Sequence, residues 1–423
     1  MGSLVTRRWE SRVEGLSRRD RRGCDYEAYV PDALGGWDLL LPGDVAADIA
    51  DAETAVREMN PDGIERVSLD GLARFLLRAE SVASSYIEGL QAGARRLVEA
   101  EFALALGAEH VDRTAVEVMG NVTAMQTAVD LAASAEAITV DDLLAVHRQL
   151  MERSARPDFV GRFREAQNWI GGSSYNPCSA SFVPPPPDRV PDLVEDLVAY
   201  VNGEEHSPLT QAALAHAQFE AIHPFPDGNG RTGRALIHIV LRRRSLAPHF
   251  VPPVSLVLAT WSQDYITGLN EFCFVGSATD PRRSAAAQRW LRTFAAAVSR
   301  ACLDAAAYSE RIERQQARWR EHLGKVRAGS ATDRLLAVLS GCPLITVESA
   351  AAAIGRSKVS TGQAVNRLHE AGILRQRNVG RHRYRVFEAP DILRLFTGLE
   401  RSLASPTGDT AIGPPARAAP ARS

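Results

Sequence analysis

The residues best suited to chemistry lie in one short segment, His223 to Arg234. Within it, Gly228, Asn229 and Gly230 tolerate positive φ and can turn successive backbone N–H groups inward. A nest of this kind at the start of a helix binds anions, because the first N–H groups of a helix have no intrahelical partner. The segment therefore predicts a phosphate site.

Charged side chains around this loop fit the same ligand. Arg231 and Arg234 are three residues apart, so both lie on one side of the helix that follows, and guanidinium groups match phosphate oxygens. Asp227 offers a hard carboxylate where a phosphate-bound Mg²⁺ would sit. His223 can take up a proton near neutral pH. The segment thus predicts a base, a metal ligand and a phosphate cradle.

Each piece has an ordinary structural explanation when taken alone. A single His-Pro is usually structural, a Gly-rich loop is usually a turn, and an Arg pair is usually a solvated helix face. A Walker A loop is excluded, because neither Lys-Ser nor Lys-Thr follows the glycines. The joint pattern favours phosphate handling over these readings.

The segment resembles the signature of the Fic family, His-x-Phe-x-Asp/Glu-Gly-Asn-Gly-Arg-x-x-Arg, at every specified position. Residues 161–172 and 182–187 resemble the strand, flap and proline-rich return of Fic proteins, and residues 28–66 resemble the segment often found before the domain. Most Fic proteins are AMP transferases. The resemblance implies a protein adenylyltransferase, which moves AMP from ATP to a Ser, Thr or Tyr hydroxyl of a protein, itself included, and releases pyrophosphate.

The resemblance also implies a role for each residue of the motif. His223 would deprotonate the target hydroxyl, and Asp227 would hold Mg²⁺ against the phosphates of ATP. The backbone from Gly228 to Gly230, with the Asn229 side chain, would stabilise the α-phosphate under in-line attack. Arg231 would bind the β-phosphate and Arg234 the γ-phosphate. This division of labour is positioning plus electrostatic stabilisation.

Two further regions take roles from the same resemblance. A flap containing Ile170, Gly171, Gly172 and Phe182 would pair with the backbone of the target protein as an added strand. Tyr265 would line the adenine pocket, although residues 251–275 match the family pattern only loosely.

A second short motif lies upstream, at Ser84 to Gly89. On its own, a Ser and a Glu four residues apart on a helix usually form a solvated face. The segment nevertheless resembles the inhibitory motif of the family, Ser/Thr-x-x-x-Glu-Gly/Asn, with Ser84, Glu88 and Gly89 at the specified positions. The resemblance implies that Glu88 pairs with Arg234 and occupies the place of the γ-phosphate. In some relatives this glutamate positions a water that removes AMP, so one enzyme could both write and erase the modification.

Apolar residues recur at helical spacing along most of the chain and predict a mainly α fold. With the resemblance, the expected architecture is a Fic-type helical bundle with a small β-hairpin flap, plus a C-terminal winged helix-turn-helix domain. The predicted helices cover residues 45–59, 69–87, 95–106, 114–133, 141–154, 192–202, 208–221, 231–244 and 284–325. The predicted parts are a polar arm (1–27), an N-terminal helical segment with the inhibitory helix (28–110), a Fic catalytic core (111–300), a helical linker (301–332), a winged helix (333–400) and a disordered tail (401–423).

The predicted winged helix is basic on one side. Helices are expected over 333–339, 347–354 and 358–371, with a wing around Gly380. From Arg356 to Arg385 there are eight Lys or Arg residues and one acid, Glu370. Such a third helix and wing suit the DNA backbone and major groove. A winged helix also serves as a protein-docking or dimerisation module, so DNA, a protein partner and a homodimer all remain open.

Composition limits the remaining possibilities. The chain has 423 residues, 45% hydrophobic and 24% charged, with a net charge of −2, which excludes a collagen-like, mucin-like or mostly disordered protein. Its five cysteines are far apart and form no CxxC pair; the pattern argues against a disulfide framework or a zinc ribbon and for a reducing cytoplasm. No apolar stretch approaches the length of a bilayer span, and no secretory signal is seen, so no membrane partner is expected.

Two classes of function are compatible with these observations. The first is an enzyme, a self-inhibited adenylyltransferase that uses ATP and Mg²⁺ and carries an accessory winged helix. The second is a DNA-binding regulator whose Fic core only senses nucleotide. The intact His223 favours the enzyme, because a sensor does not need it. Within the enzyme class, a different donor such as UMP or phosphocholine is the alternative.

Overall fold

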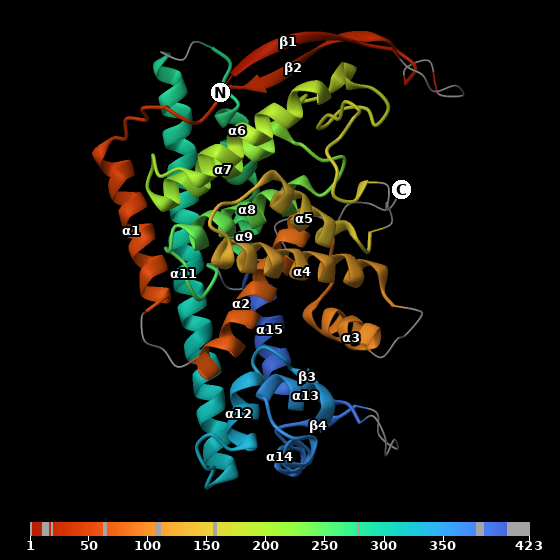
Figure 1. Ribbon diagram of the computed structural model, residues 1–423, viewed down its shortest axis with the longest axis vertical. Helices are drawn as coiled ribbons and strands as arrows, with labels where there is room; N and C mark the ends of the chain where they lie inside the picture. Colours follow the sequence, from red (N-terminus) through yellow and green to blue (C-terminus); the bar gives the residue numbers. More distant parts are fainter. Residues whose placement is uncertain are drawn as a thin grey trace. The chain divides into compact units, whose positions relative to one another are not determined.

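The computed structural model describes residues 2–10, 17, 20–61, 66–105, 111–154, 159–276, 280–377 and 385–403. The chain forms two compact units (Figure 1). Unit 1 contains the residues up to Thr54, Thr123–Leu246 and Ser262–Ala297, and unit 2 contains Ala55–Val122, Ala247–Trp261 and the residues from Val298 onward. Each unit therefore combines segments that are far apart in the sequence.

Helices dominate the described part of the chain, as the periodicity predicts. In chain order they are α1 (Gly43–Met59), α2 (Arg66–Ile87), α3 (Ala94–Ala105), α4 (Arg113–Ser134), α5 (Val140–Met151), α6 (Val190–Asn202), α7 (Pro208–Ile222), α8 (Asn229–Arg243), α9 (Val254–Thr260), α10 (Ser262–Phe272), α11 (Pro281–Leu323), α12 (Ala331–Val338), α13 (Val347–Ile354), α14 (Lys358–Glu370) and α15 (Pro390–Leu403). The strands are β1 (Gly2–Trp9), β2 (Cys24–Pro31), β3 (Leu344–Ile345), β4 (Arg375–Gln376) and β5 (Phe387–Glu388), and two short 3-10 turns are η2 (Pro177–Ser179) and η3 (Pro187–Arg189). The mainly helical fold class is confirmed.

The helix boundaries follow local signals. At the start of α5, the Thr139 side chain accepts a hydrogen bond from the Asp142 N–H while the Asp142 carboxylate accepts one from the Thr139 N–H, which is a capping box. Just past α2, Gly89 has φ +84°, as expected of a glycine that ends a helix. The sequence did not predict α9, α10 or α15.

The core of unit 1 is built around α7 and α8, which lie side by side in Figure 1. Helix α7 is buried around nearly its whole circumference, its buried polar side chains Gln211 and Gln218 included, so it has no solvent face. From α11, the Trp290 indole N–H donates to the Ala213 carbonyl of α7 (2.9 Å). This bond ties the first half of α7 to α11.

The N-terminal residues correct one expectation. Within the predicted polar arm (1–27), residues 2–9 and 24–27 are folded, because β1 and β2 pair antiparallel along their whole length, from Gly2 opposite Pro31 to Trp9 opposite Cys24. Every second residue of β2 is half-buried or buried at its start and the strand is fully buried at its end. The hairpin is therefore folded structure, with Trp9 packed edge-on against Trp169 at 5.2 Å between ring centroids.

The cysteines correct a second expectation. Cys24 of β2 and Cys178 of η2 form a disulfide across 154 residues of sequence. The sequence argued against a disulfide because no paired spacing is visible, but pairing depends on distance in the fold, and β2 packs against η2. The other cysteines, 273, 302 and 342, are free.

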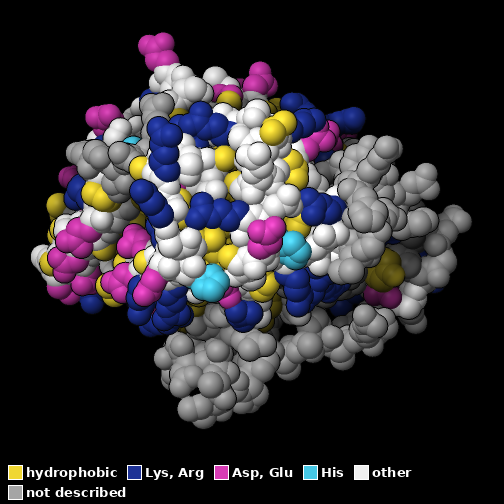
Figure 2. Space-filling model, turned by 90° about the horizontal axis from the view of Figure 1, so that it is seen from below, with side chains coloured by type: hydrophobic (Ala, Val, Ile, Leu, Met, Phe, Trp, Pro, Cys, Tyr) yellow, Lys and Arg dark blue, Asp and Glu magenta, His cyan; other side chains and the backbone are white. Residues whose placement is uncertain are grey.

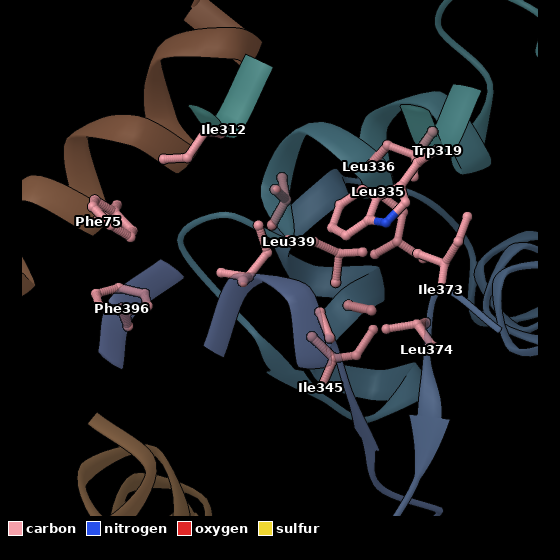
Figure 3. Close-up of a cluster of buried hydrophobic side chains, with 14 of the residues drawn as sticks. Phe75, Ile312, Trp319, Leu335, Leu336, Leu339, Ile345, Ile373, Leu374 and Phe396 are labelled. Atoms are coloured by element: carbon pink, nitrogen blue, oxygen red, sulfur yellow. The ribbon is translucent and has the colours of Figure 1, made fainter. Parts of the chain in front are cut away.

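Unit 2 has its own core, formed by α2, which carries the predicted inhibitory motif, and by the C-terminal helices (Figure 3). Phe75 of α2, Ile312 of α11, Leu339 just past α12 and Phe396 of α15 are all buried in one cluster. A Cβ on Gly71 of α2 would overlap the Ser340 hydroxyl. Helix α2 and the end of α12 are therefore in backbone-close contact, which only a glycine permits.

The C-terminal segment, residues 331–403, contains α12, α13, α14 and α15. It also contains a small sheet in the order β3-β5-β4. Both strand pairs are antiparallel. The predicted wing around Gly380 lies at 378–384, outside the described residues, as does the predicted tail beyond residue 403. In the described part of the chain, no helix combines the length and the apolar character needed to cross a membrane.

Candidate active site

The predicted base, His223, lies at the C-terminal end of α7 in a left-handed conformation, with φ +49° and ψ +58°. Its N–H still bonds to the Phe219 carbonyl (2.9 Å). Left-handed backbone is uncommon for a residue with a side chain and persists only where the surroundings hold it. The imidazole Nδ1 lies 4.0 Å from a carboxylate oxygen of Glu220. The backbone at His223 is therefore strained, and this strained conformation sets the direction of the imidazole.

Arg164 holds the backbone at His223 in place. Its guanidinium donates to the carbonyls of His223 (2.9 Å), Pro185 (2.5 Å) and Ile222 (3.3 Å), and its own N–H donates to the Pro224 carbonyl (2.9 Å). The side chain is almost fully buried, and burial lowers the pKa of Arg164 to about 10. One arginine therefore links the motif to the irregular segment before the flap and to the proline-rich return.

The motif loop is closed by Asn229. Its amide oxygen accepts the Phe225 N–H (2.8 Å) and its amide nitrogen donates to the Phe225 carbonyl (2.8 Å). Asn168 reinforces the same carbonyl (3.2 Å). The Asn229 side chain was predicted to contact the α-phosphate; in the structure its two polar atoms brace the loop.

Helix α8 begins directly after this loop and points its N-terminus at the site. Gly228 is the N-cap, with φ +79°, and no side chain caps the helix there, so the N-terminus keeps its affinity for anions. Asp227, with a 44% exposed side chain, lies 3.8 Å from Arg231. Of the predicted nest only Gly228 is left-handed, because Asn229 and Gly230 are already the first residues of α8. The structure thus brings together a helix N-terminus, a carboxylate and Arg231.

The arginines of α8 are buried. Arg231 and Arg234 are 6% and 1% exposed, unlike the solvated helix face that an arginine pair usually forms. No group of three His, Cys, Asp or Glu residues that could hold a metal occurs among the described residues. Mg²⁺ at a nucleotide site commonly uses one or two carboxylates plus substrate phosphates, which Asp227 fits.

Tyr265 of α10 is buried rather than open. Its hydroxyl lies 2.9 Å from Nε2 of His216, and both rings pack near Trp290. Burial first, and then the nearby Arg234 guanidinium, lower the pKa of His216 to about 3. The role predicted for Tyr265 in an adenine pocket stays a prediction.

A second histidine, His147 of α5, lies beneath the loop. The Gly161 N–H donates to its Nδ1 (3.1 Å), and its Nε2 lies 3.0 Å from the Asp227 carbonyl oxygen. The ring stacks on Phe225 at 3.7 Å between centroids and 2° between planes. Burial lowers the pKa of His147 to about 4, so the ring is neutral at pH 7.

The predicted flap is a single antiparallel bridge between Ile170 and Phe182. The Ile170 N–H donates to the Phe182 carbonyl (2.8 Å), and the Phe182 N–H donates back (3.2 Å). Gly171 and Gly172 have φ of +76° and +73°, and a Cβ on either would meet Ser181 or Ser179. Ile170 is 46% exposed, so a hydrophobic side chain is presented at the flap.

The N-terminal hairpin supports the base of this flap. The Asn176 amide donates to the Asp20 carbonyl (3.1 Å), the disulfide joins Cys24 to Cys178, and the Tyr29 N–H donates to the Val183 carbonyl (2.8 Å). These contacts hold the middle and the C-terminal end of the flap segment.

The predicted inhibitory residues lie in unit 2, at the end of α2. Ser84 is fully buried, and Glu88 and Gly89 are exposed. Asn121 of α4, also buried, donates to the Ser81 carbonyl (2.7 Å) and to the Ser85 hydroxyl (3.1 Å). Arg234 belongs to unit 1, so its pairing with Glu88 stays a prediction.

The described residues of the basic stretch make contacts within unit 2, whereas Arg381 and Arg383 lie outside the described residues. Lys and Arg side chains gather on the face shown in Figure 2, but acids accompany them. Arg375 and Arg377 both pair with the buried carboxylate of Glu388, and Arg377 also pairs with Glu99 of α3. The remaining basic contacts are Lys358 with Glu348, Arg356 with the Gly329 carbonyl, Arg367 with the Leu323 and Lys325 carbonyls, and Arg385 with Asn366.

Sequence reasoning missed three residues at the site, His147, Arg164 and Glu220. Arg164 stands in a short polar segment and His147 on an otherwise apolar helix face, and a lone histidine or arginine in such a context carries no distinctive spacing. His147 and Arg164 are identified only by their hydrogen bonds to the backbone around the motif, and Glu220 only by its distance to the His223 imidazole.

Two family models match the chain. Residues 137–241 match the Fic/DOC family and residues 46–130 match the Fic/DOC family N-terminal segment. Over 118 residues the chain is 34% identical to protein adenylyltransferase fic-1 of Caenorhabditis elegans and 36% identical to protein adenylyltransferase Fic of Drosophila melanogaster. The matched segment is 27% of this chain and spans only about a fifth of each relative, 21% and 22% of their lengths.

Solved structures of similar proteins include a Fic family protein from Desulfovibrio desulfuricans. It is 22% identical, covers 83% of this chain and 97% of its own, and has a TM-score of 0.49. Residues 134–508 of Fic-1 from C. elegans give 20% identity, cover 63% of this chain and 73% of that one, and have a TM-score of 0.46.

Proposed function

Because the chain carries a Fic domain preceded by the Fic N-terminal segment, we propose that it is a protein adenylyltransferase. It transfers AMP from ATP to a Ser, Thr or Tyr hydroxyl of a protein, itself included, and releases pyrophosphate. The observation that carries this proposal is the complete motif around one loop, with His223 at the end of α7 and the uncapped N-terminus of α8 beside it.

In the proposed reaction His223 acts as the general base. Its imidazole takes the proton of the target hydroxyl while that oxygen attacks the α-phosphorus of ATP. A bond forms from the target oxygen to the α-phosphorus, and the bond from the α-phosphorus to the β-bridging oxygen breaks. Glu220, close to Nδ1 of His223, stabilises the imidazolium that results.

The phosphates are held by α8. Its first backbone N–H groups face the α-phosphate, where negative charge moves during transfer. Arg231 and Arg234 bind the β- and γ-phosphates through their planar guanidinium groups. Because both groups are buried, their attraction to phosphate is stronger than it would be in water. Asp227 would hold Mg²⁺, which when bound neutralises phosphate charge.

The upstream motif supplies the proposed brake. Glu88 pairs with Arg234 and takes the place of the γ-phosphate, and the same carboxylate can position water for removal of AMP. In support, Asn121 and the buried face of α2 hold this helix firmly in unit 2.

Target and nucleotide specificity would come from two other regions. The flap at Ile170 to Gly172 and Phe182 pairs with the backbone of the target protein, supported by the exposure of Ile170. Tyr265, on α10, would line the adenine pocket.

We propose that the C-terminal segment is a winged helix that contacts protein. The engagement of its basic residues by Glu388, Glu99 and backbone carbonyls favours protein over DNA. A homodimer through this segment is one such contact. We also propose a cytoplasmic location, but the Cys24–Cys178 disulfide counts against it, because disulfides are rare in a reducing compartment, so the state of these two cysteines in the cell decides the question. Rapid alkylation of fresh lysate followed by mass spectrometry tests that point.

The test of the activity uses ATP labelled at the α-phosphate, with Mg²⁺, on wild type, Glu88→Gly and Glu88→Gly/His223→Ala. Label on protein in the second form, far above the other two, is expected. Equal label in wild type and Glu88→Gly would contradict the proposed inhibition by Glu88. No label in any form, with label transferred from UTP or a phosphocholine donor, would replace AMP by another group. Binding of DNA by the full chain without transfer would favour the regulator.

A further inference from the structure

His147 makes two hydrogen bonds that leave its ring only one possible tautomer. The Gly161 backbone N–H can only donate, and it points at Nδ1 (3.1 Å), so Nδ1 carries the lone pair. The proton of the neutral ring is then on Nε2, which donates to the Asp227 carbonyl oxygen (3.0 Å). Both nitrogens are used, and the side chain is fully buried.

The same ring is also a packing surface for the motif loop. It stacks face to face on Phe225, at the beginning of the loop. At the end of the loop, a Cβ added to Gly228 would lie 3.4 Å from Nε2 of His147, 3.0 Å from Leu150 and 3.2 Å from Met151. One face of α5 therefore contacts both ends of the turn that leads into α8.

We infer that His147 is a positioning residue for the phosphate-binding loop, which it holds through the peptide between Asp227 and Gly228. That peptide joins the candidate Mg²⁺ ligand to the N-cap of α8, so its position sets both the carboxylate and the first N–H groups of the helix. The inference rests on the proposed function. A displacement of the reacting groups by about 1 Å costs on the order of 100-fold in rate.

The arginines do not depend on this bond, because Arg231 and Arg234 are placed by α8 itself. Loss of His147 should therefore lower the turnover number more than it weakens ATP binding. A purely structural residue would instead lower the amount of folded enzyme, and both kcat per folded molecule and KM would stay unchanged.

The test compares two replacements in the Glu88→Gly background. His147→Phe keeps a flat ring against Phe225 and removes both hydrogen bonds. His147→Gln keeps one donor and one acceptor on a side chain of similar reach. Asp141→Asn, at an exposed position in the first turn of the same helix, is the matched control. Transfer of α-phosphate label, the KM for ATP and thermal unfolding are measured for each.

The expected result is a roughly 10- to 100-fold lower kcat for His147→Phe, a smaller change in KM, and partial recovery in His147→Gln. An unchanged kcat in a folded His147→Phe variant would overturn the inference, as would equal losses in folded Phe and Gln variants. If the Glu88→Gly parent transfers no label, the proposed function fails separately. The tautomer is then read directly by NMR of the full chain with ¹⁵N-labelled histidine, where a proton on Nδ1 of His147 would refute the inference and one on Nε2 is expected.

Discussion

Phe75 of α2 and Phe396 of α15 pack ring against ring, with centroids 4.1 Å apart. The first belongs to the helix that ends in Ser84 and Glu88, and the second belongs to the last helix of the described chain. Both side chains are buried in the core of unit 2 (Figure 3). The candidate inhibitory helix is thus part of the same core as the C-terminal segment.

Truncating this contact should loosen α2. For Phe396→Ala we expect a loss of about 3–5 kcal/mol in the free energy of unfolding of unit 2, because a buried aromatic ring is removed and a cavity remains. Hydrogen exchange of the α2 amides should quicken. Arg394→Ala, at an exposed position on the same helix, is the control, and equal exchange in both variants would contradict the expectation.

Two glycines in unit 2 should respond oppositely to alanine. Gly71→Ala forces a methyl group into the Ser340 hydroxyl and the Ala337 carbonyl, so α2 and α12 must separate and stability falls. Gly398→Ala, within α15, meets nothing within 4 Å and should raise stability by up to about 1 kcal/mol through its helix propensity. Denaturant midpoints measure both. A neutral Gly71→Ala would disprove the close approach of the two helices.

The disulfide should contribute measurably to stability. Closing a loop of this length in the unfolded chain corresponds to about 2–5 kcal/mol, so reduction should lower the unfolding midpoint. A Cys24→Ser/Cys178→Ser variant should match the reduced wild type and show no response to reductant. A midpoint unaffected by reductant in wild type, with both thiols shown to be free, would contradict the expectation.

Acid should destabilise the protein partly through His216. Its pKa is about 3 in the fold against an ordinary 6.5, so between these values the unfolded chain binds a proton that the folded chain does not. Stability from this group is complete above pH 6.5 and is lost as the pH falls towards 3, by about 1.4 kcal/mol per pH unit. His216→Gln should show a shallower decline between pH 7 and pH 5 in denaturant titrations. An identical decline would assign the effect to other groups.

Arg164 should matter for activity as well as stability. Arg164→Met leaves three buried carbonyls without their donor and frees the strained backbone at His223. We expect kcat for label transfer to fall by about 10- to 100-fold, measured in the Glu88→Gly background. Arg162→Met, two residues earlier and exposed, is the control, and a folded Arg164→Met variant with full activity would exclude the bracing role.

Most of the helices and the motif could be predicted from local signals in the sequence. Apolar spacing placed α2, α4 and α7 within a few residues, and the glycine-rich loop followed by two arginines marked the start of α8. These features depend on neighbours within one or two turns of chain, which the sequence displays directly.

The rest depends on pairing between distant residues. The hairpin of β1 and β2 and the bond from Cys24 to Cys178 arise because segments separated in sequence meet in the fold. The sequence left DNA binding by the basic stretch from Arg356 to Arg385 possible, because its acidic partners lie outside that stretch. Glu388 follows it by three residues, and Glu99 lies on α3. His147 and Arg164 act through backbone carbonyls, and backbone partners leave no trace in residue types.

The Cys24–Cys178 bond has a consequence for how the two positions change during evolution. Each cysteine is useful only with the other, and a lone survivor would be a reactive thiol on a partly exposed segment. Descendants of this protein should therefore keep both cysteines or lose both, in step with changes in the hairpin and in η2. A lineage that shortens β2 should replace residue 178 as well, so the two ends of one covalent bond would appear in an alignment as a single correlated trait.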